Sequence, residues 1–305
     1  MSVDLSVTIG SLKFKNPVMV ASGTFGYGTE YAELFDVSKL GAVITKTITP
    51  KPRAGNPSPR IWEVGGGMLN SIGLANVGVD AFITDKLPAL RSIDTKIIVN
   101  LAGSSVEEYW EVIEKLEPHA GIDAYEINIS CPNVKDEGMA FGSNSDVTER
   151  IIKGIRSRTK RIVIPKLTPN VTSIGDIARA CEASGADAVS LINTLVGMSI
   201  DITSRRPRLA TITGGYSGPA IKPVAVAKVY EVSKAVKLPI IGIGGISSPA
   251  DALEFLIAGA TAIQVGTANF VNPQAAVQII AGLSDYCQQH KFNEIKALIG
   301  SLQSH

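Results

Sequence analysis

The chain has 305 residues, of which 45% are hydrophobic and 19% are charged, and its formal net charge is +1. A chain of this size and composition buries a large core, as one barrel domain or as two smaller domains. The near-neutral charge, without a basic block, argues against nucleic-acid binding. No apolar run approaches the roughly 18 residues needed to span a bilayer, and the first residues do not resemble a signal peptide. We therefore expect a soluble cytoplasmic protein without membrane contact.

The predicted elements alternate between strands and helices. Short β-branched runs predict strands at Pro17–Ser22, Ala42–Thr47, Ile97–Ala102, Ala124–Ser130, Ile162–Leu167, Ala188–Asn193, Pro239–Gly244 and Ala262–Gly266. Helical patterns cover Val106–Leu116, Asp146–Ser157, Ile174–Ser184, Val224–Ala235, Pro249–Ala258 and Pro273–Gln289. This alternation indicates parallel βαβ units and favours a (β/α)8 TIM barrel over an open α/β sheet. No linker divides the chain, so we predict a single domain over residues 1–305.

Two connections are longer than usual for such a barrel. Residues 48–78 are rich in proline and glycine, residues 195–220 also contain Gly214-Gly215, and each segment follows a predicted strand. We therefore expect both to be hairpin insertions over the C-terminal mouth, where barrel active sites lie. The alternative is that they form decorative hairpins or a dimer surface.

Several predicted strands end in polar residues after an apolar stretch. These residues are Lys46, Asn100, Asn128, Lys166 and Asn193. One such side chain could be a satisfied polar group of the core. Five of them at the carboxyl ends of parallel strands favour a site at the mouth.

Glycine groups follow the last two predicted strands, at Gly244-Gly245 and at Gly266-Thr267. Glycine lets backbone N–H groups approach an anion, and barrels often bind phosphate after strands 7 and 8. The Rossmann fingerprint is absent from these segments. The phosphate would belong either to a phosphorylated substrate or to FMN, and turn formation alone is the alternative.

Lys166 suits FMN better than a phosphorylated substrate, and Cys131 suits the role of a base. A lysine beside the N1/O2 edge of a flavin stabilises the negative charge of the reduced ring. The alternative is that Lys166 pairs with a carboxylate inside the barrel. Cys131 lies among polar side chains after a strand, where its thiolate can serve as a base. An inert role suits Cys181 and Cys287 better.

The cysteines are too scattered to build a metal centre. They form no disulfide framework and no Cys-x-x-Cys pair. An iron–sulfur cluster needs several grouped cysteines, so a cluster that works with this protein must lie on another chain. None of the three histidines ends a predicted strand, so we expect no histidine base and no metal site.

These segments resemble class 1 dihydroorotate dehydrogenases. The resemblance runs in order along nearly the whole chain, through Ala21–Gly26, Thr45–Thr47, Asn70–Leu74, Asn128–Asn133 and Ile243–Ile246. It implies FMN as cofactor and oxidation of (S)-dihydroorotate to orotate in pyrimidine biosynthesis. It also implies that Cys131 removes the C5 proton, that the C6 hydride passes to flavin N5, and that Lys46 lies between substrate and flavin.

The resemblance implies two further sets of residues and no metal. The FMN set is Ser22, Lys46, Thr47, Asn100, Asn128, Lys166, Ile192, Gly218, Gly244, Gly245, Gly266 and Thr267. The substrate set is Lys46, Asn70, Ser71, Ile72, Gly73, Leu74, Asn128, Asn133, Asn193 and Thr194.

Ser22–Gly26 and Leu69–Asn76 are most similar to class 1B. That class implies an NAD-linked enzyme whose electrons leave through a separate subunit carrying FAD and a [2Fe-2S] cluster. It also implies a homodimer docked to two such subunits, a heterotetramer. Class 2 enzymes use a serine base and a membrane-associating segment, which this chain lacks. Asn76-Val77-Gly78 departs from the expected Asn-Pro-Gly.

Three alternatives stay open from the sequence. The first is a class 1A enzyme that uses fumarate as electron acceptor. The second is a flavin-free barrel lyase or isomerase that acts on a phosphorylated metabolite through a Schiff base on Lys46 or Lys166. The third is a catalytically inert scaffold subunit of a redox complex.

Overall fold

The computed structural model describes residues 3–130, 142 and 144–303. Eight parallel strands close a barrel in the order β10-β15-β16-β3-β4-β7-β8-β9. In chain order they are β3 (Val18–Val20), β4 (Ala42–Ile44), β7 (Lys96–Leu101), β8 (Ala124–Asn128), β9 (Ile162–Leu167), β10 (Val189–Leu191), β15 (Ile240–Ile243) and β16 (Ala262–Val265). Each strand coincides with a predicted run to within one residue at its start. The predicted (β/α)8 barrel is confirmed.

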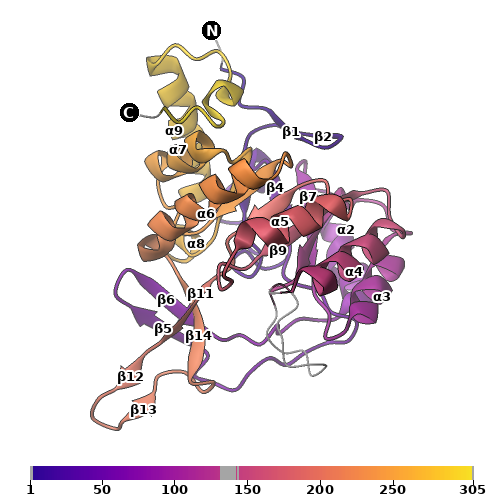
Figure 1. The fold of residues 1–305 in the computed structure, drawn as a ribbon. Helices are drawn as coiled ribbons and strands as arrows, with labels where there is room; N and C mark the ends of the chain where they lie inside the picture. Colours follow the sequence, from indigo (N-terminus) through magenta and orange to yellow (C-terminus); the bar gives the residue numbers. More distant parts are fainter. Residues whose placement is uncertain (1–2, 131–141, 143, 304–305) are drawn as a thin grey trace.

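Helices on the outside of the barrel connect most of the strands (Figure 1). They are α3 (Val106–Leu116), α4 (Ser145–Arg156), α5 (Ile174–Ala183), α6 (Lys222–Ala235), α7 (Pro249–Ala258) and α9 (Ala275–Gln289). All six agree with the predicted helices to within two residues at either end. Side-chain caps explain several of the starts: Ser105 caps α3, Ser173 caps α5, and Ser248 forms a capping box with Asp251 at α7.

Two connections differ from the simple alternation. Between β3 and β4 the chain forms only the short 3-10 helix η1 (Val37–Lys39). Between β4 and β7 it forms an irregular helix that was not predicted, composed of α1 (Val79–Ala81), η2 (Phe82–Lys86) and α2 (Leu87–Leu90). Pro88 interrupts the helical hydrogen bonding there, which hides the segment from a pattern search. Tertiary packing nevertheless buries its apolar side in the core.

The two long connections build a separate sheet. β5 (Ile61–Val64) and β6 (Gly67–Asn70) come from the first, and β11 (Leu195–Met198) and β14 (Thr213–Ser217) come from the second. They pair in the antiparallel order β11-β14-β6-β5, and β12 (Ile200–Asp201) with β13 (Arg206–Pro207) extends the second hairpin. Figure 1 shows this arm projecting from the barrel, on the side opposite to both termini. The expected hairpin insertions are present.

The remaining elements are short. The hairpin of β1 (Val7–Ile9) and β2 (Leu12–Phe14) turns at Gly10 against Ile162, where β9 begins. The other short helices are η4 (Pro219–Ile221), α8 (Ala268–Val271) and η5 (Ile295–Leu298). In the described part of the chain, no helix combines the length and the apolarity that a bilayer crossing requires.

Candidate active site

A cavity of about 800 Å³ opens at the carboxyl ends of the barrel strands. The arm forms one of its walls, because Met68 of β6 and Gly215 of β14 line it together with the strand ends. Of the residues that the sequence predicted for a site, the cavity brings together Ser22, Lys46, Thr47, Asn70, Ser71, Ile72, Gly73, Leu74, Asn128, Lys166, Ile192, Asn193, Thr194, Gly218, Gly244, Gly245, Gly266 and Thr267.

Three predicted residues are not among them. Asn100 is fully buried and does not line the cavity, and its amide donates instead to Glu126 Oε1 at 2.6 Å. Cys131 and Asn133 lie outside the described residues. Four of the five polar strand ends therefore meet at the mouth, and the fifth lies inside the barrel.

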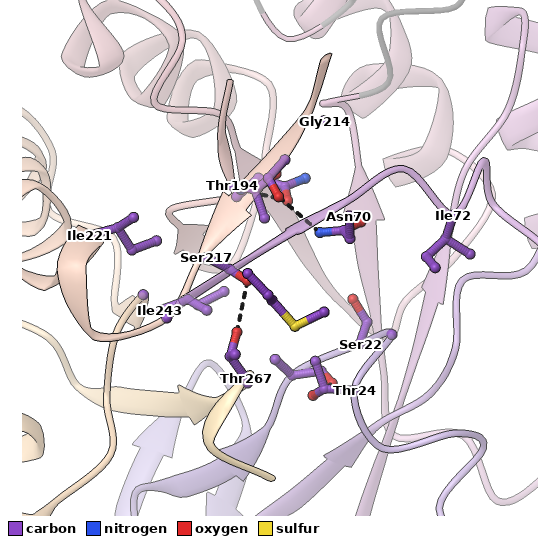
Figure 2. A pocket seen from close by; sticks show the side chains of 18 of the residues that line it. Ser22, Thr24, Asn70, Ile72, Thr194, Gly214, Ser217, Ile221, Ile243 and Thr267 are labelled. Carbon is purple, nitrogen blue, oxygen red and sulfur yellow. Dashed lines mark hydrogen bonds between the residues drawn. The ribbon is translucent and has the colours of Figure 1, made fainter. Parts of the chain in front are cut away.

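Hydrogen bonds tie the arm to the barrel around the cavity. The Thr267 hydroxyl, after β16, donates to the Ser217 hydroxyl of β14 at 2.8 Å. Figure 2 shows these two side chains facing each other. Asn70 Nδ2 donates to the carbonyl of Gly215 at 3.3 Å. The Thr267–Ser217 bond ties the arm to the barrel, and the Asn70–Gly215 bond joins β6 to β14 within the arm.

The segment after Asn70 is held by Asn76. Its Nδ2 donates to the carbonyl of Leu74 at 2.7 Å, and its Oδ1 accepts from Gly78 N at 2.8 Å. Leu74 itself has a φ of 58°, which a non-glycine residue adopts only when its surroundings fix it. Val77 stands where proline was expected, and its N–H donates to Tyr27 Oη at 3.2 Å. Proline could not make that bond.

The glycine groups form a cradle of free backbone donors. Gly244 and Gly245 have φ values of 128° and 76°, a region that side chains other than glycine rarely occupy. A Cβ on Gly245 would lie 2.8 Å from Lys222 N and 3.0 Å from the carbonyl oxygen of Gly218. Within the described residues, the amides of Gly244, Gly245 and Thr267 find no acceptor. They are available to an anionic ligand.

Two lysines face the cavity in different settings. Lys166 Nζ lies 3.4 Å from Ser22 Oγ and 3.7 Å from Glu126 Oε1, so it does pair with a carboxylate inside the barrel while still lining the cavity. Lys46 has no ion pair within the described part of the chain. Burial, followed by the positive charges of Arg60 and Lys166, lowers the pKa of Lys46.

Amide groups gather beside the lysines. Asn193 Nδ2 lies 3.5 Å from Asn128 Oδ1, which also accepts from Ser130 N at 3.2 Å. Asn193 Oδ1 accepts from Thr194 N at 2.8 Å, and Tyr109 Oη donates to the carbonyl of Asn128 at 2.8 Å. Fixed amides that offer both donors and acceptors suit a planar ligand with an imide edge.

Buried polar residues that the sequence pattern did not predict lie beneath the cavity. Glu126 is fully buried and accepts hydrogen bonds from Asn100, Ser190 and Gln264. One signal was present: Glu126 lies two positions before Asn128 in an apolar strand and therefore on the same face. In the part of the chain that is described, no cluster of histidine, cysteine, aspartate or glutamate is arranged to hold a metal ion.

Comparison with known proteins agrees with this arrangement. The family model described as "Dihydroorotate dehydrogenase" matches residues 4–286. The chain is 56% identical to "Dihydroorotate dehydrogenase B (NAD(+)), catalytic subunit" of Geotalea daltonii, over 98% of both chains. It is 54% identical to the proteins of the same name from Trichlorobacter lovleyi, over 99% of this chain and 100% of the relative, and from Parabacteroides distasonis, over 98% of both.

These matches confirm the predicted resemblance to class 1 enzymes and its closer similarity to class 1B. The match covers the barrel, the arm and the cavity, so it does not rest on one shared segment. The chain belongs to the dihydroorotate dehydrogenase family.

Proposed function

We propose that this chain oxidises (S)-dihydroorotate to orotate in pyrimidine biosynthesis, and that its electrons reach NAD⁺ through a separate subunit. One observation carries the proposal: residues expected to hold a flavin and residues expected to hold the substrate line a single cavity at the barrel mouth. The names of the relatives support the NAD-linked form over the fumarate-dependent one. They also support an enzyme over an inert scaffold.

The cavity fits FMN. Its phosphate would be held by the free amides of Gly244, Gly245 and Thr267, which form a cradle that a Cβ at Gly245 would fill. When bound, FMN accepts the hydride that leaves C6 of dihydroorotate. Lys166, close to Ser22 at the cavity floor, supplies a positive charge beside the flavin ring.

The remaining predicted residues complete the flavin site. Lys46, Thr47, Asn128, Ile192, Gly218 and Gly266 line the same cavity and would surround the ring, ribityl chain and phosphate. Asn100 does not line the cavity. It donates to Glu126, which in turn pairs with the cavity residue Lys166. Among the described residues its buried Oδ1 has no hydrogen-bond partner, and its predicted contact with FMN stays a prediction.

The substrate would lie between the flavin and the arm. Asn70, Ser71, Ile72, Gly73 and Leu74 line the arm side, and Asn128, Asn193 and Thr194 line the barrel side. Their fixed amides and hydroxyls would orient the pyrimidine ring and its carboxylate. Lys46, without an ion pair in the described residues, would contact both ligands.

Cys131 is our proposed base, with Asn133 as a further substrate contact. Cys131 directly follows Ser130, which lines the cavity, and Asn133 comes two residues after Cys131. The thiolate would take the proton from C5 of dihydroorotate, and the positive charges of Lys46 and Lys166 at the mouth favour the thiolate.

The proposed assembly extends beyond this chain. FAD and a [2Fe-2S] cluster would lie on the partner subunit, since the cysteines of this chain are scattered and its relatives are named catalytic subunits. We further propose a single-domain chain that works in the cytoplasm as a homodimer, with two partner subunits completing a heterotetramer.

Anaerobic flavin spectroscopy tests the activity. The purified chain, reconstituted with FMN, is expected to bind it and to lose its absorption near 450 nm on addition of dihydroorotate, while orotate perturbs the spectrum without bleaching it. Bound FMN that dihydroorotate does not reduce would refute the proposal. Trapping of a phosphorylated metabolite on Lys46 or Lys166 by borohydride would instead support the flavin-free lyase.

Co-purification tests the electron path. Expression together with the proposed FAD and iron–sulfur subunit should give a red-brown complex with NAD⁺-dependent activity. A chain that stays yellow and alone, and that passes electrons to fumarate, would be a class 1A enzyme.

A further inference from the structure

Glu126 on β8 is a buried carboxylate to which the proposed reaction gives no role. Its side chain is 1% exposed. Three other barrel strands donate to it: Asn100 Nδ2 from β7 at 2.6 Å, Ser190 Oγ from β10 at 2.9 Å, and Gln264 Nε2 from β16 at 2.6 Å. A group contacted from so many strands lies at the centre of the barrel, directly beneath the mouth.

The neighbours of Glu126 are three hydrogen-bond donors and one cation. The three polar groups face it as donors, and the fourth neighbour is the ammonium group of Lys166, 3.7 Å from Oε1. Donors and a cation stabilise a carboxylate, whereas a protonated carboxyl group would have to donate a hydrogen bond in turn. A negative charge therefore lies below the cavity.

Lys166 stands between this charge and the cavity. Across β8 and β9, Lys166 pairs with Asn128, and Glu126 lies two residues before Asn128 on the same face, one layer deeper. Lys166 Nζ lines the cavity and reaches Ser22 Oγ at 3.4 Å. An ammonium group has three donors, so the ion pair with Glu126 leaves donors for a ligand.

Lys46 lacks such a counter-charge. It lines the same cavity, yet among the described residues no carboxylate lies within ion-pair distance of it. The two lysines repel each other across the mouth. Glu126 is thus placed to offset the charge of one lysine and to leave the other unopposed.

We infer that Glu126 is a positioning residue that holds Lys166 at the floor of the cavity and, through its negative charge, limits how strongly Lys166 stabilises the reduced flavin. The inference rests on the proposed function, because it needs FMN in this cavity. Glu126 would set the midpoint potential of the flavin without touching flavin or substrate.

The test is the midpoint potential of bound FMN in Glu126→Gln. This change removes the charge and keeps the shape, and the unpaired Asn100 Oδ1 and Gln264 Oε1 can turn to accept from the new amide. With Lys166 no longer offset, we expect reduced FMN to bind about tenfold more tightly relative to oxidised FMN. That factor corresponds to a rise of about 30 mV for a two-electron couple.

If the inference is right, the effect of Glu126 on the flavin potential acts through Lys166. In a Lys166→Met background, Glu126→Gln should shift the potential much less, because the ammonium group that Glu126 positions is then absent. Glu117→Gln is the matched control: Glu117 accepts from Tyr125 Oη of β8 at 3.0 Å, but it follows helix α3 and does not line the cavity. It should not move the potential.

Several outcomes would overturn the inference. They are an unchanged potential in Glu126→Gln, an equal shift in the Lys166→Met background, or an equal shift in Glu117→Gln. If the variants still bind FMN, any of these three outcomes contradicts only the inference about Glu126. A wild-type chain that takes up no FMN contradicts the proposed function as well.

A flavin-free measurement covers the possibility that Glu126→Gln folds poorly. Lys166→Met leaves a buried carboxylate without its cation and should lower the thermal midpoint of the apo chain. The double variant Glu126→Gln/Lys166→Met removes both charges and should recover most of that loss. A double variant no more stable than Lys166→Met would show that the two charges are not coupled, and would overturn the inference.

Discussion

The two ends of the barrel use polar side chains in opposite ways. At the amino end, carboxylates are satisfied by the protein itself. Asp187 accepts from Val163 N at 2.8 Å and pairs with Arg156 at 2.8 Å. Asp123 in the same way accepts from Ile97 N at 2.9 Å. These carboxylates tie neighbouring segments of the barrel together at its amino end.

At the mouth, by contrast, polar groups are placed but not satisfied. The amides of Gly244, Gly245 and Thr267 lack acceptors within the described residues, and Lys46 lacks a carboxylate there. Burying such groups without partners costs free energy, so a stable protein keeps them where a ligand completes them. The difference separates residues that stabilise the fold from residues that serve the reaction.

The largest effect should come from the cysteine that follows the mouth strand β8. Cys131→Ala should slow reduction of bound flavin by dihydroorotate about 10²–10⁴-fold, the usual contribution of a general base, while FMN stays bound. Cys181→Ala is the control, because Cys181 is buried in α5 and burial raises the pKa of its thiol. Stopped-flow absorbance measures both, and equal rates in Cys131→Ala and wild type would exclude the base.

The second largest effect should come from the cradle of backbone amides at Gly244, Gly245 and Thr267. Gly245→Ala strains a left-handed residue and places a methyl group against Lys222 N, so we expect the Kd for FMN to rise about 10–100-fold. Gly65→Ala, in the arm, places its methyl group in open space and should bind FMN normally. Fluorescence titration of the apo chain gives both constants. Equal affinities would place the phosphate elsewhere.

The amino end should respond in stability alone. Asp187→Ala leaves Val163 N without its acceptor and should lower the free energy of unfolding by about 1–3 kcal/mol, with flavin affinity unchanged. Asp94→Ala removes an exposed pair with Lys15 and should cost less than about 1 kcal/mol. Urea unfolding reports the stability, and a loss of FMN binding in Asp187→Ala would break the division between the two ends.

The smallest effect concerns the pH dependence of Lys46. Because the folded state lowers the pKa of Lys46, folding opposes its protonation, and this cost is complete below the folded pKa. It disappears as the pH rises towards the unfolded value of about 10.4. Lys46→Met should therefore stabilise the apo chain at pH 7, with a gain that shrinks between those two pKa values.

Lys115 is the control, because folding shifts its pKa in the opposite direction to that of Lys46. A hydrogen bond from Lys115 to Asp80 raises the pKa of this exposed lysine, so Lys115→Met should give no gain in stability at pH 7. Urea unfolding of both variants at neutral and alkaline pH makes the comparison. A Lys46→Met variant that gains nothing would mean that the lysine is not desolvated at the mouth.

Much of this molecule could be predicted from local sequence patterns. Apolar β-branched runs predicted the eight barrel strands, and helical patterns predicted α3, α5 and α7. The irregular helix at Val79–Leu90 could not be predicted, since Pro88 breaks its pattern and only packing against the core holds it. Local preference is weak there, and tertiary burial decides.

The sequence by itself determined the family, the barrel and most residues of the mouth, because polar strand ends and glycine turns are local features that a pattern records. Only the tertiary structure decided how these residues are paired. Glu126, Ser190 and Gln264 come from strands far apart in the chain, and closure of the barrel brings them together beneath Lys166. The same closure places Asn100 in that buried group instead of on the cavity wall. A buried charge needs partners within a few ångströms, and that distance is set by the fold.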